Sequence, residues 1–232
     1  MISRVFPWGT NAKMIFDVAK LGYLGGWVCD LTYGRGSFWR KYYPAHLTGC
    51  DLVERYSPIG FPVDFRHTPF ADQQFDSVVL DAPYRLNGRP NLGEFDERYG
   101  LEQYTKWQGR MQLIKEGITE GTRISKEWFM VKCQDQVVSG KIRWQTTEFA
   151  AHAELCGFEL WDRFDMFRAK PSRQPAGRLQ LHTHNNTSSL LILRRTIRAG
   201  GNRGDRLSKR GTHQTEDPGG SSTEVGSRGD VE

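Results

Sequence analysis

The sequence predicts an α/β fold in which a mostly parallel, seven-stranded sheet carries helices on both faces. Two observations lead to this prediction. Short apolar runs alternate along the chain with longer stretches of helical periodicity. Hydrophobic residues make up 38% and charged residues 25% of the 232 residues, which suits one packed core of common size.

The first predicted helix, Asn11–Leu24, has apolar residues at helical spacing and stops at Gly25–Gly26. Further helices are expected over Ser37–Tyr43, Tyr104–Glu120 and Trp144–Gly157. The seven expected strands are Trp27–Leu31, His46–Val53, a short strand ending at Asp64, Phe75–Leu80, Glu127–Cys133, Phe158–Phe167 and Ser188–Arg195. Their alternation with helices favours parallel pairing.

The composition changes at about Ile197, where Gly, Ser, Thr and mixed charges replace apolar residues. We therefore expect a folded domain over residues 1–196 and a disordered polar tail over 197–232. The net charge is +5, and the tail contains six basic and six acidic residues, so the positive excess lies in the domain. A basic excess suits a polyanionic partner, although ordinary surface charge explains it equally well.

Four cysteines, Cys29, Cys50, Cys133 and Cys156, form no CxxC pair. We interpret them as reduced thiols, and no metal site is expected. The chain shows neither a secretory signal nor an apolar run of the ~20 residues that span a membrane. The expected protein is soluble and cytoplasmic, with no membrane partner.

A glycine-rich turn follows the first predicted strand, in the segment Val28–Ser37. The strand runs into Asp30, and Gly34 and Gly36 allow positive φ angles and a close approach of a ligand to the backbone. A GxG turn alone is equally typical of an ordinary strand-to-helix connection.

A carboxylate lies at the end of the next predicted strand, where Asp51 is 21 residues after Asp30. An acid about 20 residues beyond a glycine-rich turn is placed to bind ribose hydroxyls, and the two features together favour a nucleotide-like ligand. Asp64 could accept a hydrogen bond from an adenine amino group, and Phe65 could stack on the ring. Taken alone, this third segment is uninformative.

The segment Val78–Tyr84 combines a buried strand with the residues Asp81, Ala82, Pro83 and Tyr84. This segment resembles the Asp-Pro-Pro-Tyr motif of the S-adenosylmethionine-dependent amino-methyltransferases of nucleic acids (N6-adenine and N4-cytosine type). The resemblance covers roughly residues 8–195, with detailed matches in the motifs only. It implies a Rossmann-like methyltransferase fold and S-adenosyl-L-methionine as cofactor.

The resemblance also implies roles for individual residues. The cofactor would be bound by the glycine-rich turn, by the segments around Asp51 and Asp64, and by a segment near Thr10–Lys13 that matches the family only weakly. The implied cofactor-binding residues are Thr10, Asp30, Thr32, Tyr33, Gly34, Gly36, Asp51, Leu52, Asp64 and Phe65. Two residues depart from the family pattern. Thr32 replaces a frequent Phe, and Ala82 replaces the first Pro, which we expect to loosen the loop without abolishing activity.

In the implied mechanism, Asp81 and the Ala82 carbonyl each accept one hydrogen of an exocyclic amino group. Pro83 restricts Ala82 to extended conformations, which helps to direct that carbonyl. Tyr84 would stack on the target base, a contact worth about 1–3 kcal/mol. Without the upstream motifs, a strand followed by an Asx-Pro turn and a packed tyrosine would explain this segment as well.

Two basic segments are candidates for nucleic-acid contacts. Loop formers follow Tyr84, and we expect this loop to be mobile and to lie over the base. The second segment connects the last two strands and suits a flexible phosphate-binding loop, with a solvated connector as the alternative. The candidate phosphate-binding residues are Arg85, Arg89, Arg168, Lys170, Arg173 and Arg178. His182 and His184 lack an evident third ligand, so they are expected to form a polar edge.

Three functions remain open from the sequence. The first is a DNA methyltransferase acting on single- or double-stranded DNA, with adenine N6 favoured over cytosine N4. The second is an RNA methyltransferase acting on adenine N6 or guanine N2. The third is a catalytically impaired module that binds cofactor and nucleic acid, which only Ala82 supports. The oligomeric state is not predicted.

Overall fold

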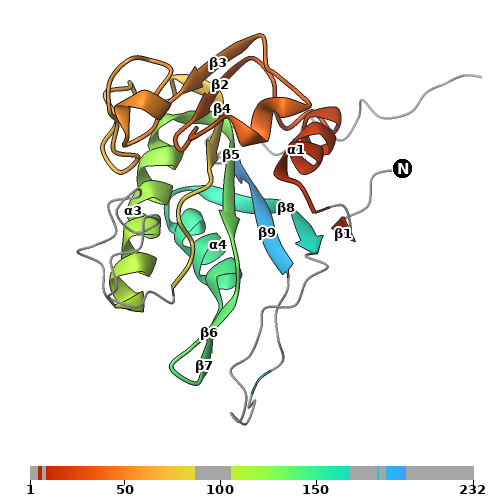
Figure 1. Ribbon diagram of the computed structural model, residues 1–232, viewed down its shortest axis with the longest axis vertical. Helices are drawn as coiled ribbons and strands as arrows, with labels where there is room; N and C mark the ends of the chain where they lie inside the picture. The colour runs from red at the N-terminus through yellow and green to blue at the C-terminus, as the bar shows by residue number, and fades with distance from the viewer. Residues whose placement is uncertain (1–4, 7–8, 87–105, 168–181, 183–186, 197–232) are drawn as a thin grey trace, which may run out of the picture. The chain divides into compact units, whose positions relative to one another are not determined.

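A computed structural model describes residues 5–6, 9–86, 106–167, 182 and 187–196 (Figure 1). Its central sheet contains seven strands in the order β1-β8-β9-β5-β4-β2-β3. The bounds are β1 Val5–Phe6, β2 Trp27–Asp30, β3 His46–Gly49, β4 Phe75–Leu80, β5 Ser125–Cys133, β8 Phe158–Phe167 and β9 Thr187–Arg195. Neighbouring strands are parallel except for β9, which is antiparallel to both β5 and β8. The prediction of a mostly parallel seven-stranded sheet is confirmed.

The order of the strands reverses at β2. The chain adds β3 on one side of β2 and then returns to place β4 on the other side. At such a switch point the connections leave the two strands in opposite directions, which opens a crevice at their carboxyl ends. The fold therefore places the ends of β2 and β4, at Asp30 and Leu80, beside the position where ligands of such sheets bind.

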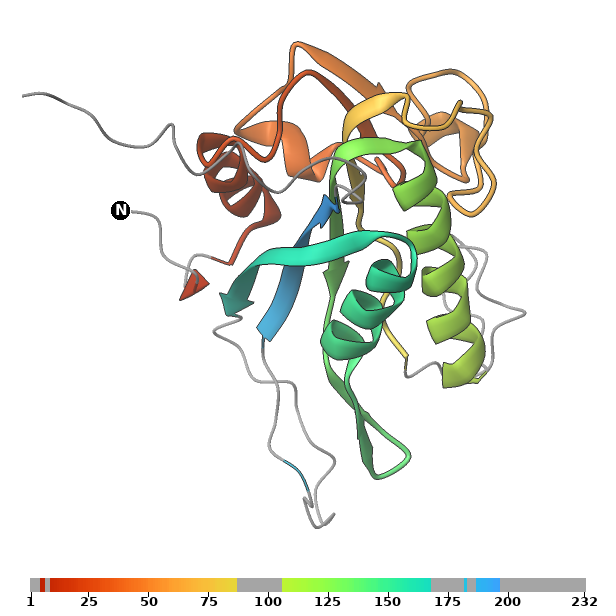
Figure 2. The ribbon, with the colours of Figure 1, turned by 180° about the vertical axis from the view of Figure 1, so that it is seen from behind.

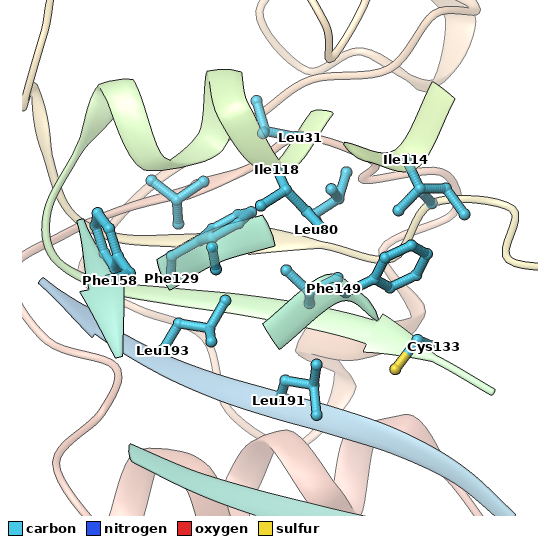
Figure 3. Packing of buried hydrophobic residues seen from close by; sticks show 14 of the residues in the cluster. Leu31, Leu80, Ile114, Ile118, Phe129, Cys133, Phe149, Phe158, Leu191 and Leu193 are labelled. Atoms are coloured by element: carbon cyan, nitrogen blue, oxygen red, sulfur yellow. The ribbon is translucent and has the colours of Figure 1, made fainter. Parts of the chain in front are cut away.

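Helices cover the two faces of the sheet, α1 on one side and α3 and α4 on the other (Figures 1 and 2). The bounds are α1 Asn11–Lys20, α3 Trp107–Ile124 and α4 Gln145–Leu155, with short 3-10 turns η1 Ser37–Arg40 and η2 Glu54–Tyr56. Because side chains alternate along a strand, Leu80 packs under α3 while Val79 packs under α1. Figure 3 shows the larger cluster, in which Phe129 and Leu193 meet Ile118 and Phe149.

The predicted strands Phe75–Leu80 and Phe158–Phe167 are confirmed with the same bounds, and the helices α1, α3 and α4 are confirmed with shifted ends. Two predicted elements are wrong. The helix over Ser37–Tyr43 is a short 3-10 turn over Ser37–Arg40, and Pro44 disfavours its continuation to Tyr43. No strand ends at Asp64, where the chain crosses the end of β3 in an irregular segment.

A hairpin follows β5 and was missed in the sequence, as was β1. It consists of β6 Gln136–Val138 and β7 Lys141–Arg143, which pair antiparallel. Ser139 and Gly140 form its turn with φ angles of 52° and 73°. Two consecutive positive φ angles define a type I′ turn, which matches the twist of the paired strands. The Ser-Gly pair at positions 139 and 140 was the available signal.

The compact unit described here lies within Met1–Thr196, and the predicted tail over 197–232 lies outside the described residues. All four cysteines are free thiols, and three of them are buried. No helix in the described segments has the length and apolar character that crossing a membrane requires. The same residues contain no group of three His, Cys, Asp or Glu side chains that could hold a metal ion.

Candidate functional site

Three carboxylates meet at the carboxyl edge of the sheet. Asp30 is the last residue of β2, Asp51 follows β3 by two residues, and Asp81 directly follows β4. They are close enough for the charges of Asp81 and Asp51 to act on Asp30. The structure thus brings together three of the residues predicted from separate motifs, at the switch point of the sheet.

The glycine-rich turn is joined to the end of β3 by Asp51. One carboxylate oxygen of Asp51 accepts the Gly34 N–H at 2.9 Å, and the other accepts the Val53 N–H at 2.9 Å. Gly34 and Gly36 have φ angles of 56° and 64°, which residues with a Cβ rarely adopt. Asp51 therefore fixes the turn in the conformation that these glycines permit.

The ring of Tyr33 packs into the space left by two glycines. A Cβ added at Gly36 would lie 2.8 Å from the Tyr33 hydroxyl, and one added at Gly49 would lie 2.6 Å from the Tyr33 ring. The Tyr33 N–H also donates to the Cys50 carbonyl at 2.8 Å. Gly36 thus makes room for a side chain of the same turn, a role that the motif alone does not reveal.

Asp30 is buried beneath this turn. Its carboxylate accepts the Thr32 N–H at 2.9 Å and the Trp39 indole N–H at 2.7 Å. The pKa of Asp30 is raised from 3.8 to about 7, and burial is the largest cause. The negative charges of Asp81 and Asp51 add to the rise, whereas the two hydrogen bonds oppose it. Asp30 therefore stabilises the glycine-rich turn through its hydrogen bonds with Thr32 and Trp39.

We expect the free energy of unfolding to decrease as pH rises between the two pKa values of Asp30, 3.8 unfolded and about 7 folded. In that range the folded chain holds a proton that the unfolded chain has released, so stability is lost as pH rises. The slope from this group is on the order of 1 kcal/mol per pH unit. Urea unfolding of wild type and Asp30→Asn measures it, and an equal pH slope in both proteins would contradict the expectation.

The segment after β4 is packed and hydrogen-bonded. The Asp81 N–H donates to the Thr32 hydroxyl at 2.8 Å, which links the ends of β2 and β4. Ala82 is 1% exposed, and Pro83 is buried beside it. Thr32, the departure from the family pattern, thus positions the backbone of Asp81 through a hydroxyl that phenylalanine lacks.

Two side-chain amides hold the next residue. The Tyr84 carbonyl accepts hydrogen bonds from Gln136 Nε2 at 2.7 Å and from Gln145 Nε2 at 2.8 Å. The same Gln136 accepts the Leu86 N–H at 3.2 Å, and the buried Arg110 donates to the Arg85 carbonyl at 3.1 Å. The expectation of a loose loop is therefore wrong as far as Leu86, and its remainder over 87–93 lies outside the described residues.

A buried lysine reaches the same edge of the sheet. Lys132 near the end of β5 is 2% exposed, and its ammonium donates to the Asn11 side chain at the start of α1. That ammonium lies 5.8 Å from the centre of the Tyr84 ring and 5.6 Å from that of Phe38. Sequence reasoning missed Lys132 and the two glutamines and included Asn11 only within the weakly matching segment near Thr10–Lys13. Residues that follow a buried parallel strand are nevertheless candidates by position.

For the remaining predicted cofactor residues, the structure gives their contacts within the protein. Asp64 forms a bidentate ion pair with Arg66, with a closest distance of 2.6 Å. Burial by itself would raise the pKa of Asp64, but the bonds with Arg66 outweigh it and lower that pKa. The Phe65 ring packs against Gly117 of α3. Thr10 caps α1 with its backbone, and Leu52 is exposed beside Asp51. The predicted roles of these residues stay predictions.

Few of the predicted nucleic-acid contacts can be placed. Arg85 is exposed at the edge of the site. Arg89, Arg168, Lys170, Arg173, Arg178 and His184 lie outside the described residues. His182 is close to the hairpin turn, where its Nε2 lies 2.9 Å from the Gly140 carbonyl oxygen.

No family model matches the sequence, and no curated protein is similar to it at a significant level. Solved structures do match. A candidate methyltransferase from Bacillus halodurans is 12% identical over 80% of this chain and 100% of its own, with a TM-score of 0.51. A protein of Thermoplasma acidophilum is 11% identical over 80% and 88% of the two chains, with a TM-score of 0.51.

The [4+2]-cyclase SpnF is also similar, at 16% identity over 80% of this chain and 82% of its own, with a TM-score of 0.50. These likenesses show that the chain has the Rossmann-like fold of methyltransferase structures. Because one of the similar structures is named as a cyclase, the fold alone does not identify the reaction. The residues of the site must identify it.

Proposed function

We propose that the protein is an S-adenosylmethionine-dependent methyltransferase that acts on an exocyclic amino group of a DNA base, with adenine N6 favoured. The observation that carries this proposal is the position of Asp81–Tyr84. An acid, a carbonyl and an aromatic ring follow β4 at the switch point, next to the glycine-rich turn and Asp51.

The residues at this edge fit S-adenosylmethionine. The carboxylate of Asp51 can accept bonds from ribose hydroxyls, since each of its oxygens has two lone-pair directions. Exposed Leu52 beside it offers an apolar surface for the adenine ring. Gly34 has a positive φ and no Cβ, so the turn would permit a close approach of the cofactor to its backbone. The cofactor would supply an electrophilic methyl group.

The chain's own residues would activate the target nitrogen. An exocyclic amino nitrogen is a poor nucleophile because its lone pair is delocalised into the ring. The Asp81 carboxylate would accept one amino hydrogen and the Ala82 carbonyl the other, which draws the nitrogen toward tetrahedral geometry and localises its lone pair. The Thr32 bond to the Asp81 N–H and the amide bonds to the Tyr84 carbonyl hold this segment from both ends.

Tyr84 would stack on the target base. Its ring is half-buried against the core and lies near the ammonium of Lys132. A packed ring loses little conformational freedom when a base stacks on it, and such a contact is worth about 1–3 kcal/mol. This is comparable to the few kcal/mol that unstacking a base from a duplex requires.

Calorimetric titration with S-adenosylmethionine and transfer of radiolabelled methyl groups to DNA and RNA test the proposal. We expect wild type to bind the cofactor and to label DNA, and mass spectrometry of the digested product to show N6-methyladenine. Asp51→Ala should weaken cofactor binding by about 10-fold or more, because a hydrogen bond to a charged group contributes about 1.5–3 kcal/mol. Label in RNA alone would assign an RNA base, and no cofactor binding would refute the methyltransferase itself.

A further inference from the structure

A basic surface with exposed aromatic rings lies on the outer side of α1 and of the segment at the end of η1, and α1 and η1 pack against each other. We call it the α1–η1 surface. Its residues are Lys13, Phe16, Lys20, Arg40, Lys41 and Tyr43. Tyr43 is 66% exposed, and Phe16 is 38% exposed with the Lys20 ammonium 4.2 Å from the centre of its ring.

The centre of this surface is hollowed. Lys13, Phe16, Asp17 and Lys41 line a depression of about 490 Å³. Asp17 is the one acid there, and its carboxylate pairs with Lys20 at 3.6 Å. Within the described part of the chain, Lys13, Arg40 and Lys41 have no ion-pair partner. The depression therefore has a positive excess that the described part of the fold leaves uncompensated.

The α1–η1 surface begins beside the candidate site. Asn11 in the first turn of α1 is bonded to Lys132 near the carboxyl end of β5, so Lys13 lies near the same edge of the sheet as Asp81. η1 directly follows the glycine-rich turn, in which Arg35 is exposed. A strand whose base enters the site would therefore reach this surface with its neighbouring nucleotides.

We propose that the α1–η1 surface binds the phosphate backbone of the DNA strand that carries the target base. The proposal rests on the proposed function, and its ligand is the phosphodiester chain. Uncompensated lysines and arginines neutralise phosphates and release condensed counterions, which stabilises binding. The exposed Tyr43 ring suits the stacking of an unpaired flanking base, as in other binders of single strands.

Arg40→Gln/Lys41→Gln in the full chain tests the surface by fluorescence anisotropy with a labelled duplex and a labelled single strand. The titrations are made without cofactor, between about 50 and 250 mM salt. The logarithm of affinity falls linearly with that of salt, with a slope of about −0.9 per phosphate contact on duplex DNA. We expect the variant's slope to be shallower by about 2, since two contacts are lost.

Lys126→Gln/Arg194→Gln is the matched control. It also removes one lysine and one arginine, but at the opposite edge of the sheet, where both cations pair with surface carboxylates at 3.2 and 3.0 Å. We expect this control to keep the wild-type slope. Equal slopes in wild type and in Arg40→Gln/Lys41→Gln, or an equal reduction in the control, would overturn the proposal.

Further measurements separate this proposal from the proposed function. If wild type fails to methylate but Arg40→Gln/Lys41→Gln still reduces the salt slope on DNA, the surface stands and the methyltransferase proposal fails. If wild type methylates DNA and the slope is unchanged in the variant, the surface proposal fails alone. Tighter binding to vesicles of anionic phospholipid than to DNA at equal phosphate would assign the surface to a membrane and also overturn it.

Discussion

Replacing Asp81 with alanine is expected to lower the rate of methyl transfer by about 10³-fold, with little change in affinity for S-adenosylmethionine. The carboxylate would accept an amino hydrogen as the nitrogen becomes tetrahedral, and losing one preorganised hydrogen-bonding group of this kind costs about 10²–10³-fold or more. Single-turnover measurements with radiolabelled cofactor give the rate, and calorimetry gives the affinity.

Asp81→Asn is the matched comparison for this experiment. Its amide oxygen can still accept an amino hydrogen, and its shape preserves the turn, but it lacks the negative charge. We expect a smaller loss than in Asp81→Ala, of about 10–100-fold, since neutral acceptors form weaker hydrogen bonds than ionised ones. Equal rates in wild type and Asp81→Ala would remove Asp81 from the mechanism.

Replacing Gln145 with alanine is expected to lower the rate by about 10²-fold through the position of the Tyr84 segment. Gln145 is fully buried, and its amide donates to the Tyr84 carbonyl at 2.8 Å. A displacement of about 1 Å in a reacting group can cost 10²-fold, even when the substitution does not touch the substrate. Losing this donor also costs about 1–3 kcal/mol of stability, which urea unfolding measures.

Comparison of kcat with KM separates positioning from simple unfolding. We expect kcat on DNA to fall while KM for the cofactor stays near wild type. Gln136→Ala removes the second donor, and the double variant should lose less than the product of the two single losses, because both act on one carbonyl. Gln112→Ala removes an exposed amide that donates to Glu116, and it should leave the rate unchanged.

Much of the fold follows from local patterns in the sequence. Both ends of the strand Phe75–Leu80 are predictable, because its apolar residues, Phe75 and Val78–Leu80, lie between clear turn residues. The same pattern places Asp30, Asp51 and Asp81 at the carboxyl ends of three strands. Ser37–Tyr43 was harder to predict, because its apolar residues Phe38 and Trp39 are buried without forming a regular helix.

The contacts that hold the site were decided by tertiary structure alone. Lys132 meets Asn11 across 121 positions of sequence, and Gln145 meets the Tyr84 carbonyl across 61. The sequence by itself determined β2, β3, β4, β5, β8 and β9 and which acids lie at their carboxyl ends, because those depend on neighbouring residues, whereas β1 and the β6–β7 hairpin were missed. Which side chains then meet depends on which strands lie side by side and on the direction of each connection, and these are settled only when the whole sheet assembles.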